Sequence, residues 1–508
     1  MKTLVMLGAC LALQISALGA VVNPGAVKVT GPVASTTPLR DPAHGYPYNS
    51  TPLDLAKYGY VEQEFFIEGT ANSYLTPPGQ PGSVKDSGHP FKTRIAVRRP
   101  KSAAKFNGTV IVEWYNVSQG HDGEYDWFQS ADHIVRNGYA WVGVSDQRVG
   151  VNSLKEWSPA RYGTLDVTDG GKVDDDSLCY DVFTAAALAI RGQGSTDVLG
   201  GLKAARLIAI GHSQSANRLY IYFHSVHPLT AKVYDAVVLH GGGGKVSGDL
   251  NVKVFKLLNE TDVTGQANNR QPDTDQYRQW EVAGTSHLDA RFSRMMAGLG
   301  LRVSGMEPVE GSPSLTGPSI SGGAGNGAAG NGDGVAGTNV CKNPPFSRIP
   351  GHYVLNALLD HTARWVQDGT PPPTASHIEL KELPPLPPSG EPAGARGGRG
   401  PQGPRWEVVH DALGNAHGGI ELAQHAVPTA ANTGQNEGGA AGGERNCNLM
   451  GSYFAWDHAR LAMLYPSHAA YMANVKEVTE KNLKAGYIVK ADAGTTIAEA
   501  AHSPIGKR

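Results

Sequence analysis

The chain has little that would tie it to a membrane or to nucleic acid. After the N-terminal segment, none of its 508 residues belong to an apolar run long enough to span a bilayer. Its 44 basic and 46 acidic side chains nearly balance, for a net charge of −2, and no basic stripe interrupts that balance. Proteins that bind nucleic acids or membrane surfaces depend on such a stripe. The composition therefore predicts no nucleic-acid partner and no transmembrane segment.

Metal and phosphate motifs are missing as well. The sequence contains no HExxH motif, no paired CxxC motifs and no cluster of carboxylates at metal-ligand spacing. The glycine-rich stretch within residues 311–339 lacks the Lys-Ser or Lys-Thr that would complete a phosphate-binding loop. We therefore expect no catalytic metal and no cofactor.

Cysteine is scarce, and each of the four cysteines has a different setting. Residues 1–20 have a basic start, an apolar stretch and small residues before a cleavage point, which predicts a signal peptide and an exported protein, secreted or periplasmic. Leu7-Gly8-Ala9-Cys10 also resembles a lipoprotein box, so a lipid anchor at Cys10 is the alternative. Cys179 lies in a helical pattern and is predicted to be a core thiol. Cys341 and Cys447 could pair in an oxidising compartment, but their spacing alone leaves this open.

Glycine (64) and proline (33) are plentiful and mark the irregular parts of the chain. Residues 21–58 are predicted to form an irregular N-terminal lead-in. Residues 59–508 are predicted to form one domain, with low-complexity insertions at about 311–339, 383–404 and 432–444.

Strand and helix patterns alternate through most of the chain. Two strands, at 61–69 and 92–100, are joined by a turn-rich segment and open the domain as a hairpin. Apolar strands follow at 109–115, 139–145, 206–211, 234–241, 252–259 and 278–284, with helices at 126–138, 177–192, 215–228 and 352–369. Continuous apolar strands separated by helices predict an α/β fold with a mostly parallel central sheet that is covered by helices on both faces. Helical periodicity returns at 452–485, which predicts a C-terminal helical extension.

One strand-to-helix junction carries a candidate nucleophile. Ser213 stands in Gly211-His212-Ser213-Gln214-Ser215, with small residues two positions before and two positions after it. A nucleophile elbow needs this pattern because its sharp turn leaves no room for larger side chains. The more usual second glycine is replaced by Ser215, which is still small.

A serine hydroxyl needs a base and an orienting acid. His287 follows the strand that ends at Gly284, and Asp262 follows the preceding strand. The order Ser213, Asp262, His287 is the nucleophile, acid, base order of α/β-hydrolases. Glu260 is the alternative acid, and His417 is the rival base.

The elbow also predicts where an oxyanion would be bound. The backbone N–H of Gln214 lies at a helix N-terminus, and a second donor is expected in the loop after the 109–115 strand, at Asn116 or Val117. His240-Gly241-Gly242-Gly243-Gly244 looks like a lipase oxyanion motif. It follows the nucleophile in the chain, so it is interpreted as a glycine-rich turn.

On these residues the chain resembles the α/β-hydrolase superfamily, and within it the exported, esterase-like alpha/beta hydrolase domain proteins. YVEQEFFIEGTA, VIVEWYNVS, GHSQSANRL, RQPDTDQYRQWEVAGTSH and LYPSHAAY carry the resemblance. It implies a serine hydrolase that cleaves a carboxylic ester or related acyl bond of a small-molecule substrate through an acyl-enzyme intermediate. A non-catalytic ligand-binding protein on the same fold and an acyltransferase on the same triad are the alternatives. The sequence does not predict the oligomeric state.

Overall fold

The computed structural model describes residues 26–248, 250–303, 341–384, 404–438 and 446–507. Several predicted segments lie outside the described residues: the signal peptide at 1–20 with Cys10, the insertion at 311–339, and positions 385–403 and 439–444 of the other two insertions.

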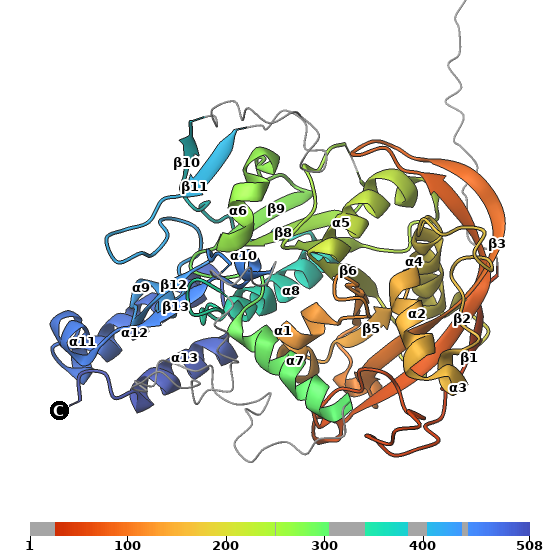
Figure 1. Ribbon diagram of the computed structural model, residues 1–508, viewed down its shortest axis with the longest axis horizontal. Coiled ribbons are helices and arrows are strands. Elements are labelled where there is room, and N and C mark those ends of the chain that lie inside the picture. The colour runs from red at the N-terminus through yellow and green to blue at the C-terminus, as the bar shows by residue number, and fades with distance from the viewer. Residues whose placement is uncertain (1–25, 249, 304–340, 385–403, 439–445, 508) are drawn as a thin grey trace, which may run out of the picture.

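A nine-stranded sheet forms the centre of the molecule (Figure 1). Its order is β1-β2-β3-β5-β4-β6-β7-β8-β9, antiparallel from β1 to β5 and parallel from β5 to β9. The strands are β1 (Lys28–Thr30), β2 (Tyr60–Leu75), β3 (Ser83–Pro100), β4 (Thr109–Trp114), β5 (Ala140–Val144), β6 (Arg206–His212), β7 (Ala236–His240), β8 (Lys253–Asn259) and β9 (Tyr277–Val282). The prediction of a mostly parallel sheet is confirmed.

Helices cover both faces of this sheet (Figure 1). The first part of the chain contributes α1 (Tyr125–Arg136), α2 (Arg148–Trp157), α3 (Pro159–Tyr162), α4 (Cys179–Leu188), α5 (Gln214–Ile221), α6 (Glu260–Gln266) and α7 (Ala290–Val303). The second part contributes α8 (Gly351–Asp368), α9 (Ala423–Ala426), α10 (Cys447–Met450), α11 (His458–Leu464), α12 (His468–Ala485) and α13 (Lys490–His502). No helix among the described residues is both long enough and apolar enough to cross a membrane.

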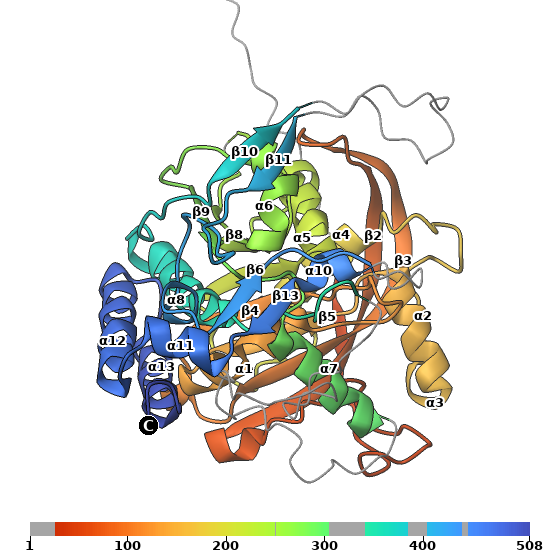
Figure 2. The same cartoon turned by 60° about the vertical axis from the view of Figure 1, so that its left-hand side comes forward.

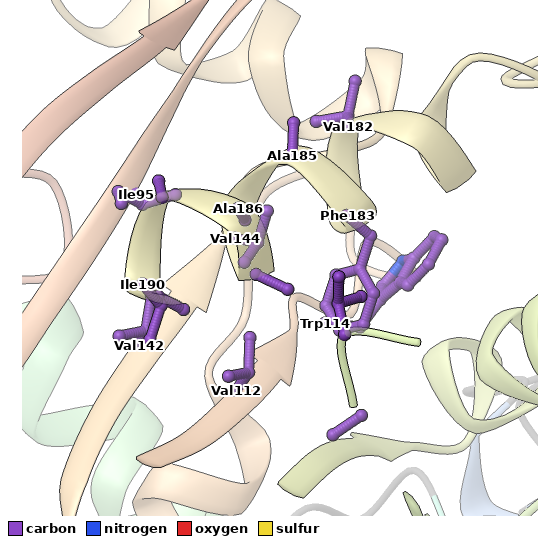
Figure 3. Close-up of a cluster of buried hydrophobic side chains, with 14 of the residues drawn as sticks. Ile95, Val112, Trp114, Val142, Val144, Val182, Phe183, Ala185, Ala186 and Ile190 are labelled. Atoms are coloured by element: carbon purple, nitrogen blue, oxygen red, sulfur yellow. The ribbon is translucent and has the colours of Figure 1, made fainter. Parts of the chain in front are cut away.

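Most side chains of the central strands are apolar because each face of the sheet is buried. On β4, Val110 and Val112 pack into the core shared with α4 and α5, whereas Ile111 packs into the core shared with α1 and α8. Figure 3 shows the first of these cores, in which Trp114 of β4 meets Phe183 of α4, with ring centroids 4.8 Å apart. Burial of a side chain of this size stabilises the fold by roughly 1.5–3 kcal/mol.

Two small antiparallel pairs lie outside the central sheet. They are formed by β10 (Leu380–Leu383) with β11 (Arg405–Val408), and by β12 (Ala430–Thr433) with β13 (Ser452–Ala455). The C-terminal helices stand beside α8 (Figure 2), where Asn356 of α8 donates a hydrogen bond to Asp492 of α13 at 2.8 Å.

The structure differs from the sequence-based expectation at several elements. β3 begins at Ser83, inside the segment predicted to be a turn, because Ser83 already pairs with Leu75 of β2. Residues 452–455 form β13, not a helix, because they pair with β12. The helix α7 follows His287, where the sequence pattern predicts no helix. In the predicted irregular lead-in, β1 adds an edge strand to the sheet.

Cys341 and Cys447 form a disulfide, with their Cα atoms 5.5 Å apart, and Cys179 is a buried free thiol. The disulfide joins the segment before α8 to the start of α10, two parts of the chain 106 residues apart. Residues 432–438 of the third predicted insertion belong to this ordered region: β12 includes Asn432 and Thr433, and Gly438 forms a bridge with Cys341.

Candidate active site

Ser213 lies on a sharp turn between β6 and α5. Its backbone has φ 61° and ψ −112°, a conformation that non-glycine residues seldom adopt. The Ser213 N–H donates to the carbonyl of His240 on the neighbouring strand β7 at 2.8 Å, which holds the turn against the sheet. Strain of this kind persists where the surrounding structure enforces it, and it is concentrated at functional sites.

The small residues around Ser213 fit the space that the turn leaves. A Cβ atom on Gly211 would come within 2.9 Å of the Ser215 backbone, and one on Gly242 would come within 2.7 Å of the Ser213 carbonyl oxygen. Ser215 is fully buried, and its hydroxyl donates to the His212 carbonyl at 2.9 Å. The serine that replaces the usual glycine thus makes its own hydrogen bond within the turn.

His287 and Asp262 are paired beside this turn. His287 Nδ1 lies 2.6 Å from Asp262 Oδ1, and their side chains are only 5% and 6% exposed. The other carboxylate oxygen of Asp262 accepts the Asn259 N–H at 2.9 Å. Burial raises the pKa of Asp262, but the charge and hydrogen bond of His287 and the Asn259 N–H outweigh it and leave that pKa below its usual value. An ionised carboxylate on Nδ1 orients the imidazole with Nε2 as its proton-accepting atom.

Asp262 lies in the first turn of α6, directly after β8. Thr261, the preceding residue, accepts the His287 N–H at 3.2 Å and donates to the Gly434 carbonyl at 2.6 Å. The backbone of the histidine loop is therefore tied to the same helical turn that supplies the carboxylate.

Glu260, the alternative acid, faces elsewhere. One of its carboxylate oxygens accepts the Gly284 N–H at 2.7 Å, and the other accepts the Gly434 N–H at 2.9 Å and lies 3.2 Å from His410 Nε2. These partners occupy both oxygens and connect β9, α6 and the segment after β12. Glu260 has the contacts of a buried structural carboxylate.

The glycine-rich turn after β7 forms one wall of the site. A Cβ atom on Gly241 would lie 3.0 Å from the His287 ring and 3.3 Å from the Asp262 carboxylate, so a side chain there would displace the pair. Lys256 is buried behind the turn and donates to the Gly244 carbonyl at 3.2 Å and to Gln266 at 2.7 Å. Burial lowers the pKa of Lys256 to about 8.

Three histidine rings meet at the elbow. The His212 ring lies 4.3 Å from that of His287 and 4.5 Å from that of His240, centroid to centroid. His240 Nδ1 lies 2.8 Å from a carboxylate oxygen of Asp126 in α1. Burial, together with the charges of His287 and His240, holds the pKa of His212 well below its usual value. His212 is therefore neutral at neutral pH and adds no charge beside Ser213.

The N-terminus of α5 and the loop after β4 face each other across the turn. The strand order reverses at this point, since β5 lies on one side of β4 and β6 lies on the other. Ligand sites of parallel sheets form at such points. The predicted donor Asn116 does not have a free N–H, because it donates to the Gly123 carbonyl at 3.0 Å. The Val117 N–H points to the Gln214 side-chain oxygen at 3.4 Å, a long contact that a better acceptor would replace.

Gln214 is itself held by a buried neighbour. Its side-chain amide donates to Gln147 Oε1 at 2.8 Å, and the same oxygen accepts the Trp114 indole N–H at 3.1 Å. The Gln147 amide donates to Asp176 at 3.3 Å. Gln147 therefore determines where the Gln214 side chain lies relative to Val117.

Buried arginines on β3 anchor the loop that carries Val117. Arg94 donates to Asp122 and to Glu64, each at 3.2 Å, and Arg98 contacts both carboxylate oxygens of Glu124. Both arginine side chains are nearly inaccessible to solvent. Removing one partner from such buried pairs is strongly destabilising, so the loop position is firmly set.

The other sequence candidates are outside this cluster. His417 is exposed in an extended segment, and its backbone bonds to Glu379 and Val409. Among the described residues, no group of three or more His, Cys, Asp or Glu side chains is arranged to hold a metal ion.

Residues 29–498 match the family model described as "Alpha/beta hydrolase domain". The chain belongs to this family. No curated protein matches it.

Family membership agrees with the sheet order and with the strand-to-helix turn at Ser213. The solved structures similar to this family member include an α/β serine hydrolase of Xanthomonas campestris, at 16% identity over 46% of this chain and 91% of that one, with a TM-score of 0.26. An α/β serine hydrolase homologue of Coxiella burnetii is 12% identical over 43% of this chain and 93% of that one, with a TM-score of 0.26.

Sequence reasoning missed Gly241, Gln147 and the His240–Asp126 pair. The glycine run after His240 was the available signal for Gly241. The run follows Ser213 in the chain, which argues against an oxyanion motif. It nevertheless lies beside Ser213 in space, because β7 is the neighbour of β6 in the sheet. Nothing in the local sequence marks Gln147, because its partners come from β4, α5 and the segment before α4.

Proposed function

We propose that the protein is an exported serine hydrolase that cleaves carboxylic esters through Ser213, His287 and Asp262. The observation that carries the proposal is the strained turn at Ser213 beside a buried His287–Asp262 pair with a 2.6 Å contact. An imidazole oriented by a carboxylate is the base that a serine hydroxyl needs at neutral pH.

In the proposed reaction, His287 Nε2 takes the proton of Ser213 as Oγ attacks the ester carbonyl. The tetrahedral intermediate collapses when His287 returns that proton to the leaving alcohol, which leaves an acyl group on Ser213. Water, deprotonated by His287, then releases the carboxylic acid and restores the serine. Asp262 holds Nδ1–H throughout and stabilises the imidazolium.

Backbone N–H groups of Gln214 and Val117 bind the oxyanion in this proposal. The Gln214 N–H is at the first position of α5, where the helix leaves N–H groups without helical partners. The oxyanion replaces the Gln214 side-chain oxygen as acceptor of the Val117 N–H, while Gln147 still holds the Gln214 amide N–H. Each such donor contributes about 3–4 kcal/mol to transition-state stabilisation.

Export is proposed from the N-terminal sequence, and the Cys341–Cys447 disulfide supports it, because disulfides persist mainly in oxidising compartments. The lipid anchor at Cys10 remains the alternative, and mass spectrometry of the mature N-terminus distinguishes the two.

A fluorophosphonate probe tests the proposed function directly. We expect one covalent adduct, mapped by mass spectrometry to Ser213. The His287→Ala variant is expected to lose labelling, and His417→Ala is expected to keep it, because His417 is exposed and away from the elbow. A folded protein without an adduct would support the ligand-binding alternative. Loss of labelling in His417→Ala but not in His287→Ala would assign the base to His417.

We expect Gln147→Leu to lower kcat by about 10- to 100-fold and to leave KM nearly unchanged. Leucine fills a similar volume but no longer accepts from Gln214 and Trp114, so the Gln214 side chain loses its fixed position at the proposed oxyanion site. Steady-state kinetics with p-nitrophenyl acetate measures both constants.

Gln279→Leu is the matched control, since Gln279 is equally buried but bonds to Tyr277 and Glu281 on β9. A kcat decrease of the same size in both variants would mean that buried glutamines affect activity only through general stability.

A further inference from the structure

A wide groove begins next to the proposed acid and is not used by the proposed reaction. It has a volume of about 580 Å³, and its floor includes Glu260, Thr261 and Thr264 of α6. The walls come from the β10–β11 hairpin, the β12–β13 pair and the segment after β12, which Figure 1 shows around α6. Thr261 connects this groove to the site, because it bonds both to the His287 N–H and to the Gly434 carbonyl.

Two strands of the groove lining each contribute an aromatic side chain. Trp406 of β11 is half-buried, and Phe454 of β13 is 41% exposed, one of the few large apolar side chains among the described residues with that much exposure. The Trp406 indole N–H is covered and has no hydrogen-bond partner among the described residues. Exposed aromatic rings rimmed by polar groups are typical of binding surfaces.

Most polar groups that line the groove are uncharged side chains that can form hydrogen bonds. The side chains of Gln435 and Asn448 are exposed and make no hydrogen bond within the described part of the chain. Besides Glu260 in the floor, two further carboxylates line the groove: Glu437 is paired with Lys342 at 2.8 Å, and Glu407 has no cationic partner among the described residues. The groove therefore disfavours an anionic ligand and offers amide donors and acceptors to a neutral one.

The walls are held in place independently of any ligand. The Cys341–Cys447 disulfide joins the segments that carry Asn343 and Asn448. Asn436 donates to the carbonyls of Asn343 and Gly451 at 3.0 and 2.7 Å, which fixes the wall between them. A site formed by such cross-links is largely preorganised, and this lowers the entropy cost of binding.

We propose that this groove binds a neutral carbohydrate chain. Sugar rings combine apolar C–H faces, which pack on aromatic rings, with hydroxyl groups that both donate to and accept from amides and carboxylates. The groove presents those partners together, because aromatic rings, free amides and carboxylates all line it. Its start at Thr261 would bring an ester carried by the bound chain close to the triad. That role in substrate recruitment rests on the proposed function, whereas the binding itself does not.

Affinity electrophoresis of the full-length Ser213→Ala protein tests binding without turnover. We expect soluble xylan or mixed-linkage glucan to retard the protein and the anionic polysaccharide polygalacturonate not to retard it. Trp406→Ala and Phe454→Ala, each made in the Ser213→Ala background, are expected to weaken the retardation about tenfold. Met463→Ala in the same background is the matched control, because Met463 is an 80% exposed apolar residue of α11 that does not line the groove.

The proposal is overturned if neither neutral polysaccharide retards the protein, or if retardation is unchanged in both aromatic variants. Retardation by polygalacturonate alone also overturns it, since the ligand would then be anionic. The outcome is separate from that of the proposed function, because binding is measured on the Ser213→Ala protein, which does not turn over, and hydrolysis of p-nitrophenyl acetate is measured on the wild type. Absent hydrolysis in the wild type would remove the ester assignment but leave the binding result standing.

Discussion

Alanine at Ser213 or at His287 is expected to reduce kcat for ester hydrolysis about 10⁶-fold, and the double variant is expected to be no slower than either single variant. The two side chains act as one unit in the proposed mechanism, because a serine without a base and a base without a serine each leave no route to the acyl-enzyme. The rate that remains comes from the backbone N–H groups of Gln214 and Val117 and from substrate binding.

Steady-state kinetics of the three variants measures this effect, with thermal unfolding to show that each is folded. His417→Ala is the matched control, since it removes an exposed imidazole and should leave kcat unchanged. Additive losses in the double variant would contradict a joint role for Ser213 and His287. A Ser213→Ala variant that keeps wild-type activity would move the chemistry to another part of the molecule.

Asp262→Asn is expected to lower kcat by about 10⁴-fold while the protein remains folded. An amide at this position can present its NH₂ group to His287 Nδ1, which favours the tautomer with its proton on Nε2, so the imidazole no longer accepts the serine proton. The 2.6 Å contact between the two side chains and their burial make the effect large.

Glu260→Gln separates the two candidate acids. Its carboxylate accepts the N–H groups of Gly284 and Gly434 and does not contact His287, so we expect a loss of about 1–3 kcal/mol in the free energy of unfolding and a kcat within about tenfold of the wild type. Chemical denaturation and kinetics on both variants make the comparison. A large kcat decrease in Glu260→Gln with a small one in Asp262→Asn would assign the acid to Glu260.

For Asp262, the local sequence predicted the place in the chain, and the tertiary structure determined the local conformation and the contacts. The acid was expected after β8 from chain order, and it lies there. It belongs to the first turn of α6, where it accepts the Asn259 N–H and so satisfies a backbone group at the helix start. Asp262 therefore both caps the start of α6 and contacts His287. Its spacing from the strand does not show which of these two contacts it makes.

The oxyanion loop shows the opposite case. Asn116 and Val117 are adjacent, and the sequence favoured neither strongly. The difference between them arises from Gly123, which folds back to accept the Asn116 N–H, and from Gln214, whose side chain meets Val117 across the turn. Gly123 is seven positions from Asn116 and Gln214 is 97 positions from Val117, so no window around the loop contains the second contact.

By itself, the sequence determined the alternation of apolar strands and helices, the strand-to-helix turn at Ser213 and the chain order of the proposed nucleophile, acid and base. These features depend on local steric limits and on side-chain periodicity, which are present in any short window. Only the tertiary structure decided that Asp262 and not Glu260 meets His287, that Gly241 forms a wall of the site and that Cys341 pairs with Cys447. Those outcomes depend on which strand ends lie side by side in the sheet, and contacts between distant segments leave no signal in the residues of either segment alone.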